Sequence, residues 1–359
     1  MGNRMKIIQV LVTLAYGDGV GNDVLAIDRI IRECHYTTKI YAENIDPRIP
    51  SELVANINRL PDLKDEDIII YHLSTGTDLN YRLRDLKGKK ILVYHNVTPP
   101  GFFKEYSMSS YKLCVDGRKA MGLMKDVPDC CWADSGYNRQ ELMDAGYRCE
   151  IKTIPILIPF EDYGQPPDQT VINKYKDDHV NILFVGRIAP NKKQEDVIKT
   201  FYYYQKYINP RSRLFLAGSY NGMEKYYGKL TRYIDALQLE NVYITGHVRF
   251  PEILSYYHVA DVFLCMSEHE GFCIPLVEAM YFDIPIVAYG AAGVADTLGD
   301  AGLKMEVKDC REAAEMIDLL MQRDVLRDAI LQGQQKRLRE FSYESTRKKI
   351  IESIKEMTG

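Results

Sequence analysis

Two glutamates flank a turn in the segment EHEGFCIPLVEAM, which runs over residues 268–280. The apolar run ADVFLCMS (residues 260–267) precedes this segment and predicts a buried strand. Pro275 suits the first turn of a following helix, where its missing N–H costs nothing. The unpaired N–H groups of such a helix start could bind a diphosphate, and Glu270 and Glu278 could accept hydrogen bonds from sugar hydroxyls. The alternative is that both acids only complement the helix dipole.

A second segment, ILFVGRIAPNKKQEDVI (residues 182–198), also leaves a predicted strand through a glycine, Gly186. It carries Arg187 and, five residues later, Lys192. Two cations beside a helix start can bind phosphate groups. A solvated basic loop is the alternative.

The segment AYGDGVGNDV (residues 15–24) follows the first predicted strand. Its three glycines, which would let the backbone approach a phosphate, are Gly17, Gly19 and Gly21. Together with Glu43 after the second strand, they suggest a dinucleotide-binding dehydrogenase. However, Asn22 stands where the third glycine of G-x-G-x-x-G belongs, and a dehydrogenase would not explain the two cations. We expect Asn22 or Asp23 to cap the following helix.

Three further segments of the first half carry polar residues at or near predicted strand ends. His95 ends a strand in VYHNVTPPGFF and could bind a hydroxyl group, with a structural imidazole as the alternative. The residues expected to line an acceptor are Ser74, Gly76 and Thr77. Ser135 is expected only to cap a helix. The basic run YRLRDLKGKK (residues 81–90) could attract anionic lipid, but a solvated helix face is favoured.

Strand-like apolar runs alternate with helical patterns along the whole chain. The runs cover residues 6–14, 39–42, 67–73, 90–96 and 130–135, and then 180–188, 213–219, 241–248, 260–267, 284–290 and 302–307. A proline-rich stretch at residues 154–170 interrupts this rhythm. The pattern predicts two α/β domains, each a doubly wound parallel sheet. We place them at residues 1–158 and 171–338, with a linker at 159–170 and a terminal helix at 339–359.

Composition narrows the class of protein. The 359 residues are 46% hydrophobic and 27% charged, with a formal net charge of −4, which argues against a nucleic-acid binder. We see no signal peptide in MGNRMKIIQVLVTL and no apolar stretch of the roughly 18 residues that a membrane span needs. The eight cysteines form no C-x-x-C pair. We therefore expect a reducing, cytoplasmic location.

These motifs resemble those of the retaining glycosyltransferases of family 4, which have the GT-B fold of two Rossmann-like domains. Glu270 and Glu278 match the family's Glu-x7-Glu motif, and Gly186, Arg187 and Lys192 match its G-R-x-x-x-x-K element. Asp296 departs from the family pattern, which usually has Glu there. The resemblance is strong in the second domain and patchy in the first. It implies that the terminal helix packs back on the first domain, which would bind the acceptor.

The resemblance also implies roles for individual residues. Arg187 and Lys192 would stabilise the leaving diphosphate, Glu270 would contact the transferred sugar, and Glu278 would hold the ribose. His95 would lie near the reacting sugar. The residues that would contact the donor through the backbone or border its base are Gly17, Gly19, Gly21, Gly186, His247, Val248, Phe272, Cys273 and Ile274.

The implied reaction transfers a hexose or deoxyhexose, with retention, from a nucleotide diphosphate sugar to a hydroxyl of a glycan or lipid-linked acceptor in cell-surface polysaccharide synthesis. We expect no cofactor and no metal, since no D-x-D element stands where one would bind. A peripheral position at the inner membrane surface is compatible with the acceptors of many relatives. The alternatives are another GT-B enzyme, such as a sugar-nucleotide epimerase or a phosphorylase, and a non-catalytic partner subunit.

Overall fold

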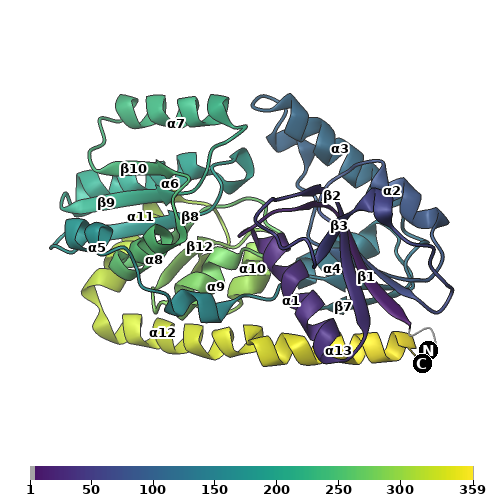
Figure 1. Cartoon of the computed structure of the whole chain (residues 1–359). Coiled ribbons are helices and arrows are strands. Elements are labelled where there is room, and N and C mark those ends of the chain that lie inside the picture. Colours follow the sequence, from purple (N-terminus) through teal and green to yellow (C-terminus); the bar gives the residue numbers. More distant parts are fainter. Residues whose placement is uncertain (1–4, 359) are drawn as a thin grey trace. The chain divides into compact units, whose positions relative to one another are not determined.

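A computed structural model describes residues 5–358 of the chain. Residues 1–4, which begin the segment considered above for a signal peptide, and residue 359 lie outside the described part. The chain divides into two compact units (Figure 1). The first consists of Met1–Gly101, Ser109–Pro159 and Phe341–Gly359, and the second of Phe102–Met108 and Phe160–Glu340.

The first unit is built on a seven-stranded parallel sheet. Its strand order is β3-β2-β1-β4-β5-β6-β7. The strands are β1 (Lys6–Leu14), β2 (Thr37–Ile45), β3 (Val54–Asn56), β4 (Ile68–Leu73), β5 (Lys89–Tyr94), β6 (Cys130–Ala133) and β7 (Glu150–Thr153). Every residue of β4 is buried, as expected for a central strand covered on both faces. The helices are α1 (Gly19–Glu33), α2 (Leu79–Arg82), α3 (Met108–Leu123), α4 (Gly136–Asp144) and α13 (Tyr343–Thr358).

The second unit is built on a six-stranded parallel sheet with the order β10-β9-β8-β11-β12-β13. The strands are β8 (Val180–Val185), β9 (Ser212–Ala217), β10 (Val242–Gly246), β11 (Val262–Cys265), β12 (Ile286–Tyr289) and β13 (Leu303–Met305). The helices are α5 (Gln169–Tyr175), α6 (Gln194–Tyr203), α7 (Glu224–Ala236), α8 (Phe250–Val259), α9 (Ile274–Tyr281), α10 (Gly293–Leu298), α11 (Cys310–Gln322) and α12 (Asp324–Leu338). Two doubly wound parallel sheets were predicted from the sequence, and the structure confirms them.

Each sheet has one point where the strand order reverses. In the second sheet the chain runs from β8 outward to β10 and then returns to the other side of β8 as β11. In the first sheet the same reversal separates β1 from β4. Ligands of open parallel sheets bind beyond the carboxyl ends of the strands at such a reversal. The segments after β8 and β11, which carry both predicted motifs, therefore meet where a ligand is expected.

The start of α1 corrects one prediction. The residue that caps this helix is Asp18, whose side chain accepts a hydrogen bond of 2.6 Å from the backbone N–H of Gly21. Asn22 and Asp23, predicted as caps, lie inside the helix. The glycines around Asp18 allow the chain to turn earlier than the hydrophobic pattern suggests. Ser135 was predicted correctly, since it caps α4 by accepting from Asn138 N.

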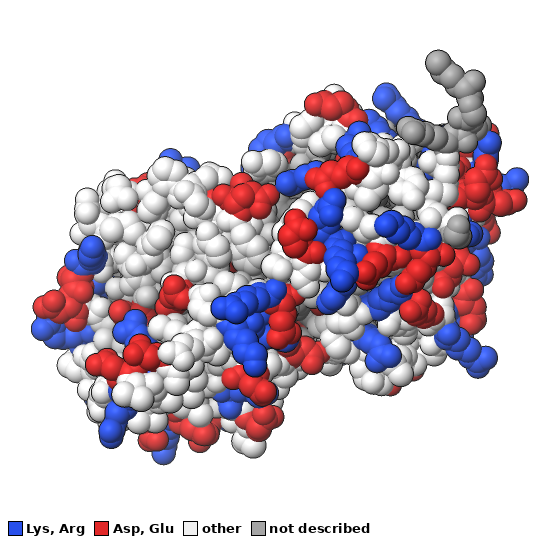
Figure 2. Space-filling view, turned by 90° about the horizontal axis from the view of Figure 1, so that it is seen from below, with Lys and Arg blue, Asp and Glu red and all other residues white. Residues whose placement is uncertain are grey.

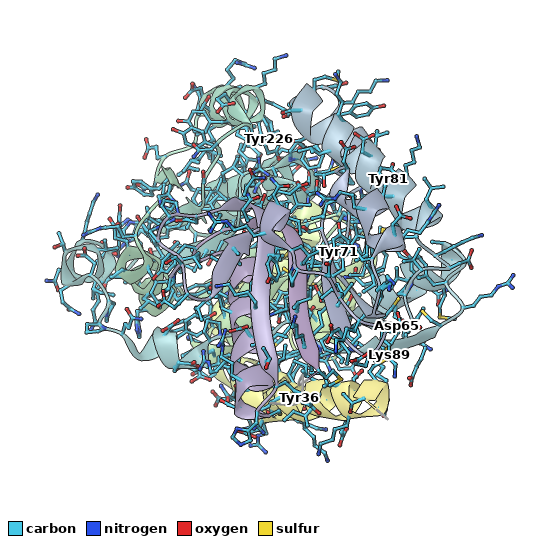
Figure 3. The ribbon with its side chains drawn as sticks, turned by 45° about the vertical axis from the view of Figure 1, so that its right-hand side comes forward. Tyr36, Asp65, Tyr71, Tyr81, Lys89 and Tyr226 are labelled. Carbon is cyan, nitrogen blue, oxygen red and sulfur yellow. The ribbon has the colours of Figure 1, made fainter. Side chains whose placement is uncertain are left out.

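Helix α13 packs on the first unit. Ile350 and Ile354 are buried in a cluster with Trp132, whose indole N–H donates to Ser353 Oγ at 2.8 Å. Tyr36 packs against the same cluster, and Lys89 Nζ donates to the carbonyl oxygen of Met357 at 2.6 Å. Figure 3 labels both Tyr36 and Lys89 beside this helix.

The surface carries mixed charge. On the face shown in Figure 2, lysine and arginine side chains lie among aspartates and glutamates. Within the basic run at residues 81–90, three side chains donate to backbone carbonyls of the first unit, namely Arg84, Lys89 and Lys90. These contacts favour a structural role for that part of the run, and attraction to anionic lipid stays a prediction. None of the helices in residues 5–358 has the length and apolar character needed to span a bilayer.

Candidate functional site

The two predicted cations lie just beyond the carboxyl end of β8. Gly186 has a φ of +148°, a conformation that favours glycine, and the next residue is Arg187. Arg187 is exposed, and its guanidinium donates to the carbonyl oxygen of Asn221 at 3.1 Å. Lys192 ends a short 3₁₀ turn, and its side chain is only 17% exposed. Arg187 is therefore exposed to solvent, whereas Lys192 is largely shielded from it.

Lys192 is paired with Glu270, one of the two predicted glutamates. Its Nζ lies 2.6 Å from Oε1 and 2.7 Å from Oε2 of Glu270. Ser267 also donates to Oε1 at 2.9 Å. Burial is the largest single influence and lowers the pKa of Lys192, but the charge and hydrogen bonds of Glu270, together with smaller contributions from Cys273 and Cys265, raise the net pKa, which favours the ammonium form. The structure thus brings together two residues that are 78 positions apart.

A second set of contacts fixes the loop that carries Glu270. Asn191 accepts from the backbone N–H of Glu268 at 2.9 Å and donates through its side chain to the carbonyl oxygen of His269 at 2.9 Å. Lys308 donates to Glu268 and to Asp196, both at 2.9 Å. These bonds tie the loop after β11 to the segment after β8. The geometry of Lys192 and Glu270 is therefore set by the surrounding backbone.

The turn into α9 has the form predicted from its sequence. Cys273 has a φ of +71°, and Pro275 stands in the first turn of the helix. A Cβ atom on Gly293 would lie 2.2 Å from the carbonyl oxygen of Gly271, so only glycine permits this close approach. Phe272 and Cys273 are buried, and Thr297 donates to the carbonyl oxygen of Phe272. Donor contact through the backbone of Phe272, Cys273 and Ile274 stays a prediction.

Glu278 projects from α9 into a group of aromatic rings. Its Oε1 accepts from the hydroxyl of Tyr163 at 2.9 Å, and its Oε2 accepts from the hydroxyl of Tyr257. Burial raises the pKa of Glu278, and the two hydroxyls counteract that rise. A carboxylate offers about four lone pairs, so each oxygen can still accept a further hydrogen bond. This arrangement suits recognition of a diol.

His247 and Val248, predicted to border a base, lie between β10 and α8. His247 is exposed and Val248 is half-buried. Gly246 precedes them with a φ of +69°. Together with the segments after β8 and β11, this loop lies at the carboxyl edge of the second sheet.

The first unit carries the remaining predicted residues. Gly17 has a φ of +79°, and a Cβ on Gly21 would lie 2.0 Å from the carbonyl oxygen of Ala15. Gly19 is the first residue of α1. This loop follows β1, at the point where the strand order of the first sheet reverses. Its contact with a diphosphate stays a prediction.

His95 belongs to a buried hydrogen-bond chain across β1, β4, β5 and β6. Its Nδ1 lies 2.9 Å from Asp134 Oδ2, and its Nε2 lies 2.8 Å from Nδ1 of His72. The Nε2 atom of His72 lies 3.0 Å from Oε1 of Gln9. The side chains of His95 and Asp134 are 1% and 2% exposed. Both ring nitrogens of His95 thus have buried partners, and its contact with a sugar stays a prediction.

The donor and the acceptor of each hydrogen bond in this buried series can be assigned, starting from Gln9. Gln9 donates through Nε2 to the carbonyl oxygen of Val24, so its Oε1 accepts from His72 Nε2. Burial, reinforced by the charge of His95, holds the pKa of His72 well below its usual value, so His72 is neutral and its Nδ1 accepts from His95. Burial is the largest single influence and lowers the pKa of His95, but Asp134, Asp23 and Asp18 together raise it above its usual value. The raised pKa favours the imidazolium form of His95 beside Asp134.

The same region contains a set of atoms with the spacing of metal ligands. Among residues 5–358, ligand atoms of Asp23, His72 and His95 lie within 4.8 Å of one another. The rings of the two histidines are nearly coplanar, with planes 4° apart. The two histidines are hydrogen-bonded to each other through His72 Nδ1 and His95 Nε2. The hydrogen-bond network therefore accounts for the two histidines, and Asp23 accepts from the backbone N–H of Leu157 at 2.8 Å. The expectation of no metal stays a prediction.

Asp23 gives this region a measurable pH dependence. Burial raises the pKa of Asp23 from 3.8 to about 7, opposed by His95 and reinforced by Asp134. The unfolded chain releases this proton near pH 4, whereas the folded chain releases it only near pH 7, so stability falls as pH rises through that window. We expect Asp23→Asn to raise the free energy of unfolding at pH 8 by ~2–4 kcal/mol, and much less at pH 4. Melting curves at both pH values measure this difference.

Asp28→Asn is the matched control for that experiment. Asp28 is on the same helix and is also buried, but it accepts from Thr38 and is paired with Arg32. Its replacement removes an ion pair and should not stabilise the protein at pH 8. If Asp23→Asn changed the free energy of unfolding equally at the two pH values, the raised pKa of Asp23 would be contradicted.

The sequence of the second unit matches a known family. Residues 167–337 match the family model described as "Glycosyl transferases group 1". This region of the second unit is thus similar to group 1 glycosyl transferases and is called the transferase domain below. The matched region contains both cations, both glutamates and the loop with His247 and Val248, so these residues belong to the transferase domain.

Curated relatives agree with the family. The chain is 27% identical to the capsular polysaccharide biosynthesis glycosyltransferase CapM of Staphylococcus aureus, over 46% of this chain and 43% of CapM. It is 25% identical to the O-antigen chain mannosyltransferase B of Escherichia coli, over 48% of this chain and 45% of that protein. The chain thus spans about half the length of the curated relatives it matches. Both relatives are named for sugar transfer, in agreement with the family model.

Solved structures agree with the fold over almost the whole chain. HepE from Anabaena, determined in complex with UDP-glucose, superposes with a TM-score of 0.75 at 17% identity, covering 98% of this chain and 100% of that one. The sucrose-phosphate synthase of Thermosynechococcus elongatus superposes with a TM-score of 0.77 at 15% identity, covering 99% of each chain. The chain therefore has the GT-B fold, and the transferase domain is the second of its two domains.

Several residues of the site were not predicted from the sequence. Tyr163 and Tyr257, which donate to Glu278, lie 115 and 21 positions from it. Nor were His72 and Asp134 linked to His95. One signal was present, since Gln9 and His72 are polar residues inside otherwise apolar strands. A polar residue in a buried strand needs a partner, and this requirement points to a buried network.

Proposed function

We propose that the protein is a retaining glycosyltransferase. It would transfer a hexose or deoxyhexose from a nucleoside diphosphate sugar to a hydroxyl of a glycan or lipid-linked acceptor in cell-surface polysaccharide synthesis. The observation that carries the proposal is the contact of Lys192 with Glu270 at the strand-order reversal of the transferase domain, with Arg187 and Glu278 on the same two segments that follow β8 and β11. The capsule and O-antigen enzymes among the relatives, and the UDP-glucose bound by HepE, support the donor and the pathway class.

The donor diphosphate would bind at the start of α9. Arg187 offers an exposed guanidinium, and Lys192 offers a buried ammonium. Negative charge develops on the diphosphate as the bond to the sugar breaks. Fixed cations stabilise that charge more in a partly buried site than in water. These two residues would supply the charge that a divalent cation supplies in other transferases, so the proposal includes no metal or other cofactor.

Glu270 suits a positioning role better than attack on the sugar. Both of its carboxylate oxygens are bound by Lys192, and Oε1 also accepts from Ser267. A carboxylate that is neutralised in this way is a weak nucleophile. The acceptor oxygen would instead form its bond to the anomeric carbon on the face that the diphosphate leaves. The acceptor proton would pass to a phosphate oxygen of the leaving group, so that charge and atoms balance and the configuration is retained.

A ligand screen tests the proposal. Thermal melting would be measured with UDP, GDP, ADP and dTDP sugars at millimolar concentration. One of them should stabilise the protein, because a ligand at 100 times its dissociation constant adds about 2.7 kcal/mol. Turnover of that sugar nucleotide should then require an acceptor, which an epimerase would not need. The proposal fails if none of these donors or their diphosphates binds.

Arg187→Ala provides the comparison within the site. It should lower the affinity for the nucleoside diphosphate about 10- to 100-fold, because it removes charged hydrogen bonds to phosphate. Arg211→Ala is the matched control, since Arg211 is 63% exposed beside the start of β9 and pairs with Asp178. Isothermal titration of both variants measures the difference. If the two variants bound the nucleoside diphosphate equally well, Arg187 would not be a diphosphate-binding residue.

A further inference from the structure

The loop after β9 lies between two segments of the transferase domain. The proposed function assigns one of them, after β8, to the diphosphate, and the sequence predicts that the other, after β10, borders the base. This loop, residues 218–223, follows a strand that neighbours both β8 and β10. The sequence alone predicted no functional role for this loop. Its central residue is Tyr220, which is half-buried.

The loop is fixed on its β8 side. The backbone N–H of Ile188 donates to Ser219 O at 2.9 Å, and Arg187 donates to Asn221 O at 3.1 Å. A Cβ atom on Gly218 would lie 2.0 Å from the carbonyl oxygen of Gly186. The backbone on both sides of Tyr220 is therefore bound to the segment that carries the phosphate-binding arginine.

The ring of Tyr220 is supported from one face. It stacks on Tyr227 of α7, with the ring centroids 4.2 Å apart and the planes 20° apart. Within residues 5–358, Tyr227 is the one aromatic side chain that stacks on Tyr220. An aromatic ring that is held flat by a second ring loses little further freedom when a planar ligand stacks on its other face.

The edge of Tyr220 reaches the loop after β10. Its Cε1 atom lies 3.5 Å from the position that a Cβ of Gly246 would occupy. Gly246 immediately precedes His247 and Val248. Tyr220 therefore lies between the arginine assigned to the diphosphate and the residues assigned to the border of the base.

We propose that Tyr220 is the stacking platform for the base of the donor nucleotide, with Tyr227 as its support. This inference rests on the proposed function and adds a specific group for the base. Stacking on an aromatic ring accepts every base, because every base has a π face. Tyr220 would thus provide affinity for the base, while the choice among bases would depend on the neighbouring backbone and side chains.

The test compares a nucleoside diphosphate with a probe that has no base. Isothermal titration would use the diphosphate found in the screen and, separately, inorganic pyrophosphate. Tyr220→Ala should lower the affinity for the nucleoside diphosphate about 5- to 100-fold. Its affinity for pyrophosphate should stay within about twofold of the wild-type value. Tyr220→Phe, which keeps the ring, should bind both probes like the wild type. Tyr207→Ala is the control for loss of a tyrosine, because Tyr207 is 70% exposed on another segment.

The outcomes separate this inference from the proposed function. If the wild type binds none of the nucleotides, the proposed function fails. If the wild type binds and Tyr220→Ala binds equally well, only the stacking role fails. An equal loss of affinity for both probes in Tyr220→Ala would also overturn the stacking role, because that result indicates that Arg187 has been displaced through the shared loop. Melting temperatures of all variants verify that the fold is retained.

Discussion

Replacing Lys192 by methionine should reduce kcat about 10²- to 10³-fold. The side chain keeps its length but loses the charge that would balance the leaving diphosphate. Because that charge develops mainly in the transition state, kcat should fall more than KM changes. Steady-state kinetics with the donor found in the screen measure both quantities.

The same substitution also removes the partner of Glu270, and this effect must be separated from catalysis. Glu270 is 11% exposed, so loss of Lys192 leaves a largely buried carboxylate without a counter-ion. Breaking a buried pair in this way costs up to about 3–5 kcal/mol of stability. The double variant Lys192→Met/Glu270→Gln has no unpaired charge and should recover most of that stability.

Catalysis and stability should therefore respond differently to the double variant. We expect its melting temperature to approach that of the wild type, while its kcat stays at the level of Lys192→Met or below. If the double variant regained activity together with stability, Lys192 would be a structural residue. If Lys192→Met kept wild-type kcat, the charge-balancing role would be wrong.

The sequence predicted the sheets well because their central strands are strongly patterned. In β4 and β9 every residue is buried, so each reads as an apolar run between turn signals. The edge strands β3 and β7 were not predicted. They contain three and four residues, and β7 has no buried residue. An edge strand that is short and exposed on both faces leaves no hydrophobic period to detect.

The candidate site was predicted as a set of residues, but its contacts were not. Periodicity and turn residues placed Lys192, Glu270 and Glu278 near strand and helix ends, which are local features. The side-chain pairs form between segments that are far apart in the sequence. Lys192 and Glu270 are 78 positions apart, and Tyr163 and Glu278 are 115 positions apart. A single sequence contains no signal for such distances, whereas the parallel order of the strands determines them.

The loop with Tyr220 shows the same limit. The segment GSYNG (residues 218–222) reads as an ordinary turn, since glycine, serine and asparagine are frequent in turns. Only the sheet order shows that β9 lies between β8 and β10, so that this turn adjoins both predicted binding segments. Position within the sheet, rather than composition, makes Tyr220 a candidate for the site.

Replacing Glu278 by glutamine should abolish recognition of the ribose while preserving the fold. Glutamine has nearly the same shape, and the hydroxyls of Tyr163 and Tyr257 can reorient to donate to its oxygen or accept from its amide. A ribose diol, however, would lose its charged acceptor. We expect the affinity for the nucleoside diphosphate to fall about 10- to 100-fold, because hydrogen bonds to a buried charge contribute ~1.5–3 kcal/mol.

A comparison of ribose with 2′-deoxyribose identifies the cause of that loss. The wild type should prefer the ribonucleoside diphosphate over its 2′-deoxy analogue, and Glu278→Gln should bind the two alike. Tyr163→Phe is the matched control, because it removes one donor but leaves the carboxylate, and it should keep the preference. A Glu278→Gln protein that still distinguishes the two sugars would show that another group holds the ribose.

The pH dependence of binding gives an independent check on the same carboxylate. Burial raises the pKa of Glu278, so the carboxylate becomes protonated at a higher pH than an exposed glutamate. A protonated carboxyl can accept fewer hydrogen bonds from the diol, so wild-type affinity should fall as pH decreases through that raised pKa. Glu278→Gln has no such group, and its weaker affinity should lack this component of the pH dependence. The loss of preference for ribose and the loss of this pH dependence should therefore occur together, because both depend on one ionised side chain.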